Sequence, residues 1–228
     1  NGKRVAEYHK RLLPYYDVFD EPRYFQPGRS GFIHQVSNLR VGVTICEDVW
    51  NLPGFLDLLH PEQPLDDYSS TKCDWLLNLS ASPFSLGKPQ RRIELLQNVV
   101  KQVGVPALFC NQVGGNDDLL FDGCSFAMHA SGQLVASGKA FDEDFFVVDT
   151  DSSSTITPAW PKEDATWLIE ALVMGVKDYF RKCGASKAVL GLSGGVDSSV
   201  TAAIAARALG PKNVIGVAMP TRFTSEGS

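Results

Sequence analysis

A loop of glycines and hydroxyl residues lies where the sequence predicts a strand followed by a helix. The loop, residues 193–199, reads Ser-Gly-Gly-Val-Asp-Ser-Ser. The apolar run 188–192 precedes it, and the helix-forming stretch 200–209 follows it. Glycines let backbone N–H groups approach an anion, and the first turn of a helix carries partial positive charge. We therefore predict that this loop binds a chain of phosphates.

The side chains of this loop indicate how the phosphates would be held. The loop has no lysine, so it differs from the Gly-x-x-x-x-Gly-Lys-Ser/Thr phosphate loop. Asp197 could instead hold Mg²⁺ beside the phosphates. The alternative is that Asp197 and Ser198 only begin the helix. The predicted phosphate-binding residues are Ser193, Gly194, Gly195, Val196, Asp197, Ser198 and Ser199.

A cysteine at the end of an apolar run provides a second reactive group. Cys46 follows the branched run 39–45 and precedes Glu47 and Asp48. Parallel α/β sheets present reactive groups at the C-terminal ends of their strands. A thiolate there could attack a carbonyl if a cation such as Lys10 stabilised the oxyanion. The alternatives are that Cys46 is a small core residue and that Lys10 is solvated.

The composition is that of an ordinary globular protein with one or two domains. The 228 residues are 44% hydrophobic and 21% charged, with a formal net charge of −5. This charge argues against a nucleic-acid partner, which needs a basic surface. No apolar run approaches the roughly 18 residues of a membrane span, and no signal peptide is recognisable. We expect no membrane partner and a cytoplasmic location.

The cysteines show no pattern of disulfide or zinc binding. There are five of them, widely spaced and without a Cys-x-x-Cys pair. Free thiols suit a reducing compartment. Apart from Cys46, we predict that they are core residues: Cys73, Cys110, Cys124 and Cys183.

Periodicity predicts an α/β fold for the first part of the chain. Apolar residues at helical spacing predict a helix over 90–103, ended by Gly104. The turn at 130–132 predicts a hairpin between 125–129 and 133–136. Branched and aromatic runs predict further strands at 39–45, 75–79, 105–111 and 145–149.

The chain changes character after residue 148. Residues 149–162 are rich in serine, threonine and proline without an apolar period, which predicts a linker. An amphipathic helix is predicted over 167–183. The strand before the glycine loop, the helix after it and a strand over 214–219 then form a βαβ unit with a parallel sheet. We therefore divide the chain into a domain at 1–150, a linker at 151–163 and a second domain at 164–228.

Four ordered segments resemble those of the nitrilase, or carbon–nitrogen hydrolase, superfamily. They are 10–25, 41–50, 78–84 and 111–125. The resemblance implies part of an α-β-β-α sandwich in which Cys46 attacks an amide carbonyl and Lys10 stabilises the oxyanion. It also implies a set of glutamine-binding residues, Tyr16, Glu21, Glu47, Ser80 and Ser82.

Two of these residues have simpler interpretations. In addition, one member of the family's catalytic triad is not matched. Glu47 could be a solvated residue at a strand end, and Tyr16 could pack in the core. The family's general-base glutamate belongs to a segment before residue 1. We therefore expect that these 228 residues alone do not carry out a glutamine-dependent reaction.

The second part resembles the N-type ATP pyrophosphatases. The loop at 193–199 is similar to their pyrophosphate loop, which implies ATP as substrate, Mg²⁺ at Asp197 and a Rossmann-like parallel sheet. Residues 216–228 resemble the second strand and loop of NAD⁺ synthetases, which implies that Met219 contacts adenine. Phe223 stands where that family has tyrosine.

Together, the two parts resemble the glutamine-dependent NAD⁺ synthetase family. The resemblance implies that L-glutamine supplies ammonia, which amidates deamido-NAD⁺ to NAD⁺ with release of AMP, pyrophosphate and glutamate. It also implies a homo-oligomer. One alternative is a glutaminase that feeds another adenylating synthetase, such as a GMP-synthetase-like domain. A second alternative is an inactive assembly module.

Overall fold

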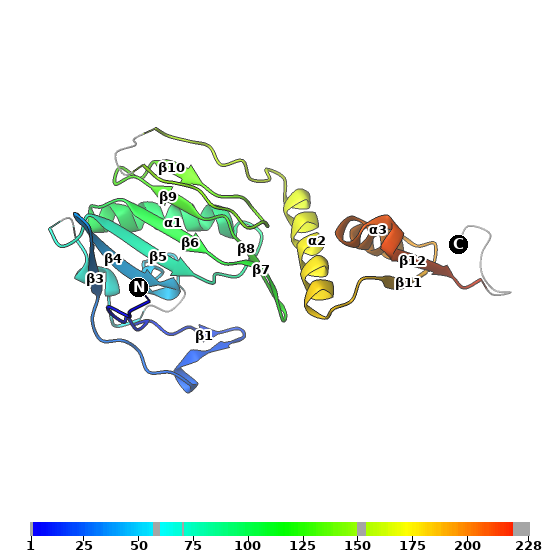
Figure 1. Ribbon diagram of the computed structural model, residues 1–228, viewed down its shortest axis with the longest axis horizontal. Coiled ribbons are helices and arrows are strands. Elements are labelled where there is room, and N and C mark those ends of the chain that lie inside the picture. The colour runs from blue at the N-terminus through cyan, green and yellow to red at the C-terminus, as the bar shows by residue number, and fades with distance from the viewer. Residues whose placement is uncertain (1, 57–59, 70, 150–153, 221–228) are drawn as a thin grey trace.

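The computed structural model describes residues 2–56, 60–69, 71–149 and 154–220. A larger α/β part is followed by a long helix and a small βαβ part (Figure 1). Phe223 and part of the predicted linker, residues 150–153, lie outside the described residues.

A mixed sheet forms the centre of the larger part, with six strands among the described residues in the order β10-β9-β6-β5-β4-β3. The pairs β4–β5 and β5–β6 are parallel, and the other pairs are antiparallel. The ends of β4, β5 and β6 therefore lie at one edge of the sheet. The strands are β3 (Phe32–Val36), β4 (Leu39–Ile45), β5 (Trp75–Ser80), β6 (Ala107–Asn111), β9 (Phe126–Met128) and β10 (Leu134–Ser137).

Helix α1 (Lys88–Val103) covers one face of this sheet. It ends where Gly104 takes a left-handed conformation with φ 73°, as the sequence predicts. Its buried stripe packs on Phe109 and Phe126 of the sheet and comprises Leu95, Leu96, Val99, Val100 and Val103. Burial of such side chains stabilises the fold by about 2 kcal/mol each.

Two short hairpins extend from the sheet. The first pairs β1 (Tyr15–Tyr16) with β2 (Phe19–Asp20). The second pairs β7 (Val113–Asn116) with β8 (Leu119–Asp122) and reaches toward the second part of the chain (Figure 1). Asp122, the last residue of β8, is fully buried.

The strand predicted at 145–149 is wrong. Residues 145–149 form no strand in the structure, and Phe145 and Val147 are among the most exposed apolar side chains. Just before this segment, the Asp144 carboxylate accepts the Lys139 backbone N–H at 3.0 Å. β-branched and aromatic composition is insufficient when no partner strand is available.

Two of the four cysteines predicted to be core residues are exposed. Cys73 and Cys124 are buried, but Cys110 and Cys183 are not. Cys110 lies on β6, whose side chains alternate between faces, and points away from the face that α1 covers. Cys183 follows the last residue of a helix that is largely exposed.

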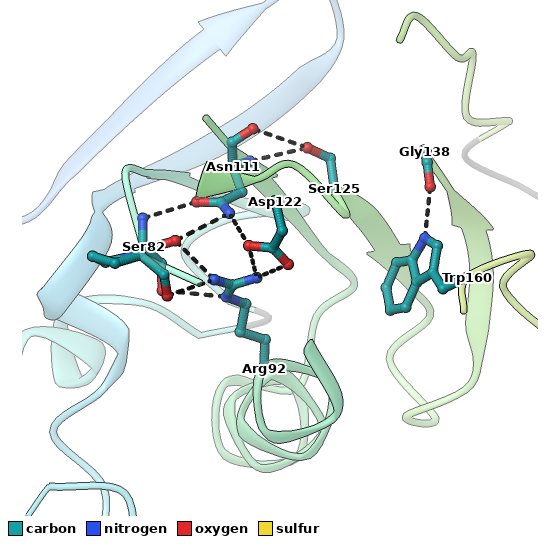
Figure 2. A network of polar contacts seen from close by, with 8 residues as sticks. Ser82, Arg92, Asn111, Asp122, Ser125, Gly138 and Trp160 are labelled. Carbon is teal, nitrogen blue, oxygen red and sulfur yellow. Dashed lines mark hydrogen bonds and ion pairs between the residues drawn. The ribbon is translucent and has the colours of Figure 1, made fainter. Parts of the chain in front are cut away.

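The segment predicted as a linker packs along the sheet. Its described residues, 154–163, contain no helix or strand. The Ile156 N–H donates to the Leu134 carbonyl at 2.9 Å, and the Trp160 indole donates to the Gly138 carbonyl at 2.7 Å (Figure 2). This segment is therefore fixed along strand β10.

The second part begins with helix α2 (Asp164–Lys182), which lies between the sheet and the βαβ part (Figure 1). Strand β11 (Ala188–Leu192), helix α3 (Val196–Leu209) and strand β12 (Val214–Ala218) follow, and β11 and β12 are parallel, as predicted. None of the described helices combines the length and apolarity that crossing a membrane requires.

Helix α2 is held against the β7–β8 hairpin. The Gly115 N–H donates to Asp178 at 2.9 Å, and the Lys182 ammonium donates to the Gly115 carbonyl. A Cβ at Gly175 would lie 2.9 Å from the Leu120 Cδ2 atom, so the glycine lets the helix and the hairpin approach without a shift of that side chain. At its other side, α2 contacts α3 through Glu170 and Arg207.

Candidate functional site

A cavity of about 410 Å³ opens beside the ends of the parallel strands. It brings together residues that are far apart in the sequence and lie on four different segments. Its lining includes six predicted site residues, Lys10, Tyr16, Glu21, Cys46, Glu47 and Ser82. The thiol and the ammonium therefore face one space, as an attack on a carbonyl requires.

Cys46 begins a tight turn directly after β4. Its φ of 44° is rare for a residue with a side chain, and a 3-10 turn (Cys46–Val49) follows. Burial raises the pKa of the Cys46 thiol, while the Lys10 ammonium, the Ala81 backbone amide and the Ser80 hydroxyl oppose this rise. The thiol therefore depends on these three groups to become a thiolate.

Lys10 is held in place by an ion pair. Its ammonium lies 2.9 and 2.8 Å from the two carboxylate oxygens of Glu21, and its side chain is only 14% exposed. The Lys10 carbonyl also accepts the Gly28 N–H at 2.8 Å. The alternative of a solvated lysine is therefore wrong.

Asp48 fastens the lysine segment to the cysteine turn, a role that the sequence did not reveal. Its fully buried carboxylate accepts the N–H groups of Arg11, Leu12 and Ile45, each at 2.9 Å. The Tyr8 hydroxyl donates to the same carboxylate at 2.7 Å. Lys10 lies inside the segment that is fixed in this way.

Removing this carboxylate is expected to cost stability. Asp48→Ala should lower the free energy of unfolding by about 3 kcal/mol, because buried N–H groups lose a charged acceptor. Urea denaturation followed by circular dichroism measures the change. Asp66→Ala, at an exposed carboxylate, is the matched control and should leave the stability nearly unchanged. Equal effects of the two substitutions would contradict the role of Asp48.

Glu47 is a buried carboxylate at the rim of the cavity. It is 2% exposed, and burial raises its pKa, which the Tyr16 hydroxyl and His60 oppose. The Tyr16 hydroxyl donates to Glu47 at 3.0 Å, and the His60 Nε2 atom lies 3.8 Å from it. Glu47 is therefore not a solvated residue, and Tyr16, which is 49% exposed, is not a core residue.

Of the two predicted serines, Ser80 is the last residue of β5 and Ser82 lies in the loop that follows. The Ser80 hydroxyl donates to Asn78 at 2.6 Å and faces Cys46. Ser82 lines the cavity, and its backbone N–H donates to the Asn111 side chain at 2.9 Å.

Among the cavity residues that the sequence did not indicate are Trp50, Phe84 and Lys88. The Lys88 ammonium lies 4.9 Å from the centre of the Trp50 ring. Burial and then the charge of Arg92 lower the pKa of Lys88. Gly87 and Pro89 on either side of this lysine were the available signal, because they predict that the helix begins at the cavity.

Phe84 joins the cavity to α2. Its ring stacks on Trp167 with centroids 5.9 Å apart and meets the edge of Phe141 at 5.2 Å. Phe141 and Trp167 in turn lie 5.5 Å apart. A close aromatic cluster thus connects the loop after β5 with the first turns of α2.

The glycine and hydroxyl loop of the second part connects β11 to α3. Gly194 takes a left-handed conformation with φ 79°, and Gly195 is the residue before the helix. The Ser198 and Ser199 hydroxyls donate to the Gly195 carbonyl at 3.0 and 2.9 Å. The Ser193 hydroxyl lies 3.2 Å from that of Ser198. The serines therefore also shape the loop itself.

The loop is open to solvent, and its predicted phosphate-binding residues are exposed, apart from a half-buried Ser198. Asp197 lies in the first turn of α3 without a capping hydrogen bond at the helix start. Met219 follows β12 and is 69% exposed. The seven loop residues are contiguous, and Met219 comes from the neighbouring parallel strand.

The fold is α/β, and a cysteine and a lysine line one cavity beside its parallel strands. Comparison with protein families gives two matches, carbon–nitrogen hydrolase over residues 1–158 and NAD synthase over residues 168–228. The chain belongs to the carbon–nitrogen hydrolase family, and an NAD synthase segment follows that region.

Named relatives match the chain over both regions. The chain is 46% identical to the glutamine-dependent NAD⁺ synthetase of Synechocystis sp. and 37% identical to that of Acinetobacter baylyi, and spans 42% and 41% of their lengths. A solved glutamine-dependent NAD⁺ synthetase from Acinetobacter baumannii, in complex with ADP, superposes with a TM-score of 0.87 at 36% identity. That match covers 99% of this chain and 42% of the other.

Proposed function

We propose that this chain provides the amide-cleaving site and the ATP loop of a glutamine-dependent NAD⁺ synthetase. The observation that carries the proposal is the cavity in which Cys46, Lys10 and two carboxylates meet. The relatives that match the whole chain have this name. We also propose the division into 1–150, 151–163 and 164–228.

The charges around the cavity suit glutamine. The buried Glu47 carboxylate would bind the α-ammonium group, with Tyr16 and Ser82 as further contacts. The Lys88 ammonium would bind the α-carboxylate. The side-chain amide then points toward the Cys46 sulfur, and Glu21 holds Lys10 beside it. A zwitterion with an amide tail fits this arrangement better than an uncharged amide does.

The reaction would proceed through a thioester. The Cys46 sulfur forms a bond to the amide carbon while the thiol proton moves to a base, and the Lys10 ammonium stabilises the negative oxygen. The intermediate collapses when the C–N bond breaks, and the nitrogen leaves as ammonia after it takes a proton. Water then cleaves the thioester to glutamate and restores the thiol.

The second part would activate the acceptor for this ammonia. The backbone of the loop at 193–199 would bind the ATP phosphates, and Met219 would contact adenine. Asp197 is an exposed carboxylate beside that backbone, which fits a Mg²⁺ ligand that shields the phosphate charge. The carboxylate of deamido-NAD⁺ would attack the α-phosphorus with loss of pyrophosphate. Ammonia would then displace AMP.

Covalent labelling tests the amide-cleaving site directly. A chloroketone analogue of glutamine should alkylate Cys46, and free L-glutamine should slow the reaction at least about tenfold at saturation. Peptide-resolved mass spectrometry locates the label. Cys110 is exposed and serves as the internal control, because its labelling should not respond to glutamine. Labelling of Cys46 that glutamine does not slow would contradict the proposed substrate and favour an assembly module.

A further inference from the structure

Arg92 is a buried arginine of α1 that the proposed mechanism does not use. Its side chain is 0% exposed, and its Nη1 atom donates to both carboxylate oxygens of Asp122, at 2.8 and 2.7 Å (Figure 2). Its Nη2 atom donates to the carbonyls of Ser82 and Pro83, at 2.7 and 3.2 Å. Its Nε atom donates to the Ser82 hydroxyl at 3.2 Å. The five N–H groups of the guanidinium are therefore matched by five contacts.

These contacts fix one residue of the cavity wall from several directions. Asn111 accepts the Ser82 N–H at 2.9 Å and donates to the Ser82 carbonyl at 3.3 Å (Figure 2). The same Asn111 amide lies 3.5 Å from Asp122. The backbone N–H, the carbonyl and the hydroxyl of Ser82 are all held by this network. The Ser82 hydroxyl accepts from Arg92, so its own hydrogen remains available to a substrate in the cavity.

The two residues just before Ser82 contact the thiol. The Ala81 backbone amide and the Ser80 hydroxyl favour the Cys46 thiolate. Ala81 precedes Ser82 directly, so the position of its amide depends on how Ser82 is held. The network therefore holds Ser82 and Pro83 while Ser80 and Ala81 contact the thiol, so both act on one four-residue segment, residues 80–83.

We propose that Arg92, paired with Asp122, is a positioning residue that fixes residues 80–83 for thiol chemistry at Cys46. The proposal rests on the proposed function, in which Cys46 is the nucleophile. Arg92 acts through Ser82 and Ala81 and does not touch the thiol itself.

The chemistry of the pair supports a positioning role over a purely stabilising one. A buried ion pair gains little stability over apolar residues of the same volume, because both charges lose their water. A guanidinium, however, can bind a carboxylate and two carbonyls at once with fixed directions. Lysine carries the same charge but lacks this planar fork.

Two variants distinguish a positioning role of Arg92 from an effect of its charge and from an effect on folding. Arg92→Lys keeps the buried charge beside Asp122 but cannot make all five contacts. The double variant Arg92→Met with Asp122→Leu removes both charges together and so avoids an unpaired one. The control is Arg40→Met with Asp74→Leu. It removes an ion pair of 2.7 Å at the starts of β4 and β5, away from the cavity at the ends of these strands.

The measurement is the rate at which iodoacetamide alkylates Cys46 in the folded protein. Peptide-resolved mass spectrometry follows Cys46 across the pH range in which a thiol titrates, and circular dichroism melting follows the fold. The other charged and titratable side chains of the cavity are not substituted in any variant: Lys10, Tyr16, Asp17, Glu21, Glu47 and Lys88.

We expect Arg92→Lys to melt cooperatively but to alkylate Cys46 about tenfold more slowly near neutral pH, with its pH profile moved upward. The double variant should behave in the same way, and the control should match the wild type. Wild-type rates and profiles in either folded Arg92 variant would overturn the proposal, and so would an equal shift in the control.

The assay does not use glutamine, so the two proposals fail in different ways. If the glutamine analogue does not label Cys46 in the wild type, the proposed function fails. If it labels Cys46 and the Arg92 variants alkylate normally, only the positioning role fails.

Discussion

Replacing Cys46 with alanine is expected to abolish glutamine-dependent NAD⁺ formation, by at least about a thousandfold. No thioester can form without the sulfur, and the remaining groups of the cavity only bind and polarise the amide. Activity with added ammonium salt should persist, because the loop at 193–199 belongs to a separate part of the fold. The assay follows NAD⁺ formation with either nitrogen donor, in a protein that carries this chain at the full length of its relatives.

A second cysteine provides the control for this substitution. Cys110→Ala changes an exposed thiol near the end of β6, two strands away from β4, and should leave both activities within about twofold of the wild type, as for ordinary surface substitutions. If Cys46→Ala still used glutamine, another residue would have to be the nucleophile, and the proposed mechanism would be wrong.

Replacing Asp197 with alanine is expected to remove activity with both nitrogen donors, by at least about a hundredfold. The substitution leaves the phosphate charge without the proposed Mg²⁺ ligand, so the acceptor cannot be activated whatever the source of ammonia. The same assay measures the effect, and fluorescence titration with an ATP analogue measures binding.

The alternative that Asp197 only begins the helix predicts a different result. Gly195 precedes the first residue of α3, and the helix start has no side-chain capping bond, so Asp197→Ala should change the melting temperature little. Asp164→Ala, in the first turn of α2, is the matched control for loss of a first-turn carboxylate. A loss of stability with normal activity would support the helix-start alternative.

Local pattern was sufficient for the elements around the cavity. The predicted strand at 39–45 has the observed bounds, and the helix predicted at 90–103 begins two residues earlier, at Lys88. Both are long, strongly patterned segments, and Gly104 ends the helix with a conformation that few other residues take. The parallel pairing of β11 and β12 also followed from their sequence.

Contacts between distant segments could not be read in the same way. Asp48 binds residues 36 and 37 positions away, and Arg92 binds Asp122 across 30 positions. Aspartate is a residue type common in turns, and only the contacts of Asp48 and Asp122 reveal that these two are buried. The prediction of a strand at 145–149 was wrong for the same reason, since a strand requires a neighbouring strand that no local pattern specifies.

The ring of Phe84 belongs to two structures at once, the wall of the cavity and the packing of α2 on Trp167. Close-packed rings cannot move independently of one another. A substrate that displaces Phe84 must therefore also displace Trp167 and α2, or α2 will oppose the movement. Helix α2 contacts α3 through Glu170 and Arg207, and α3 follows the glycine loop. A displacement of Phe84 would therefore reach α3 to the extent that the Phe84–Trp167 contact transmits it to α2.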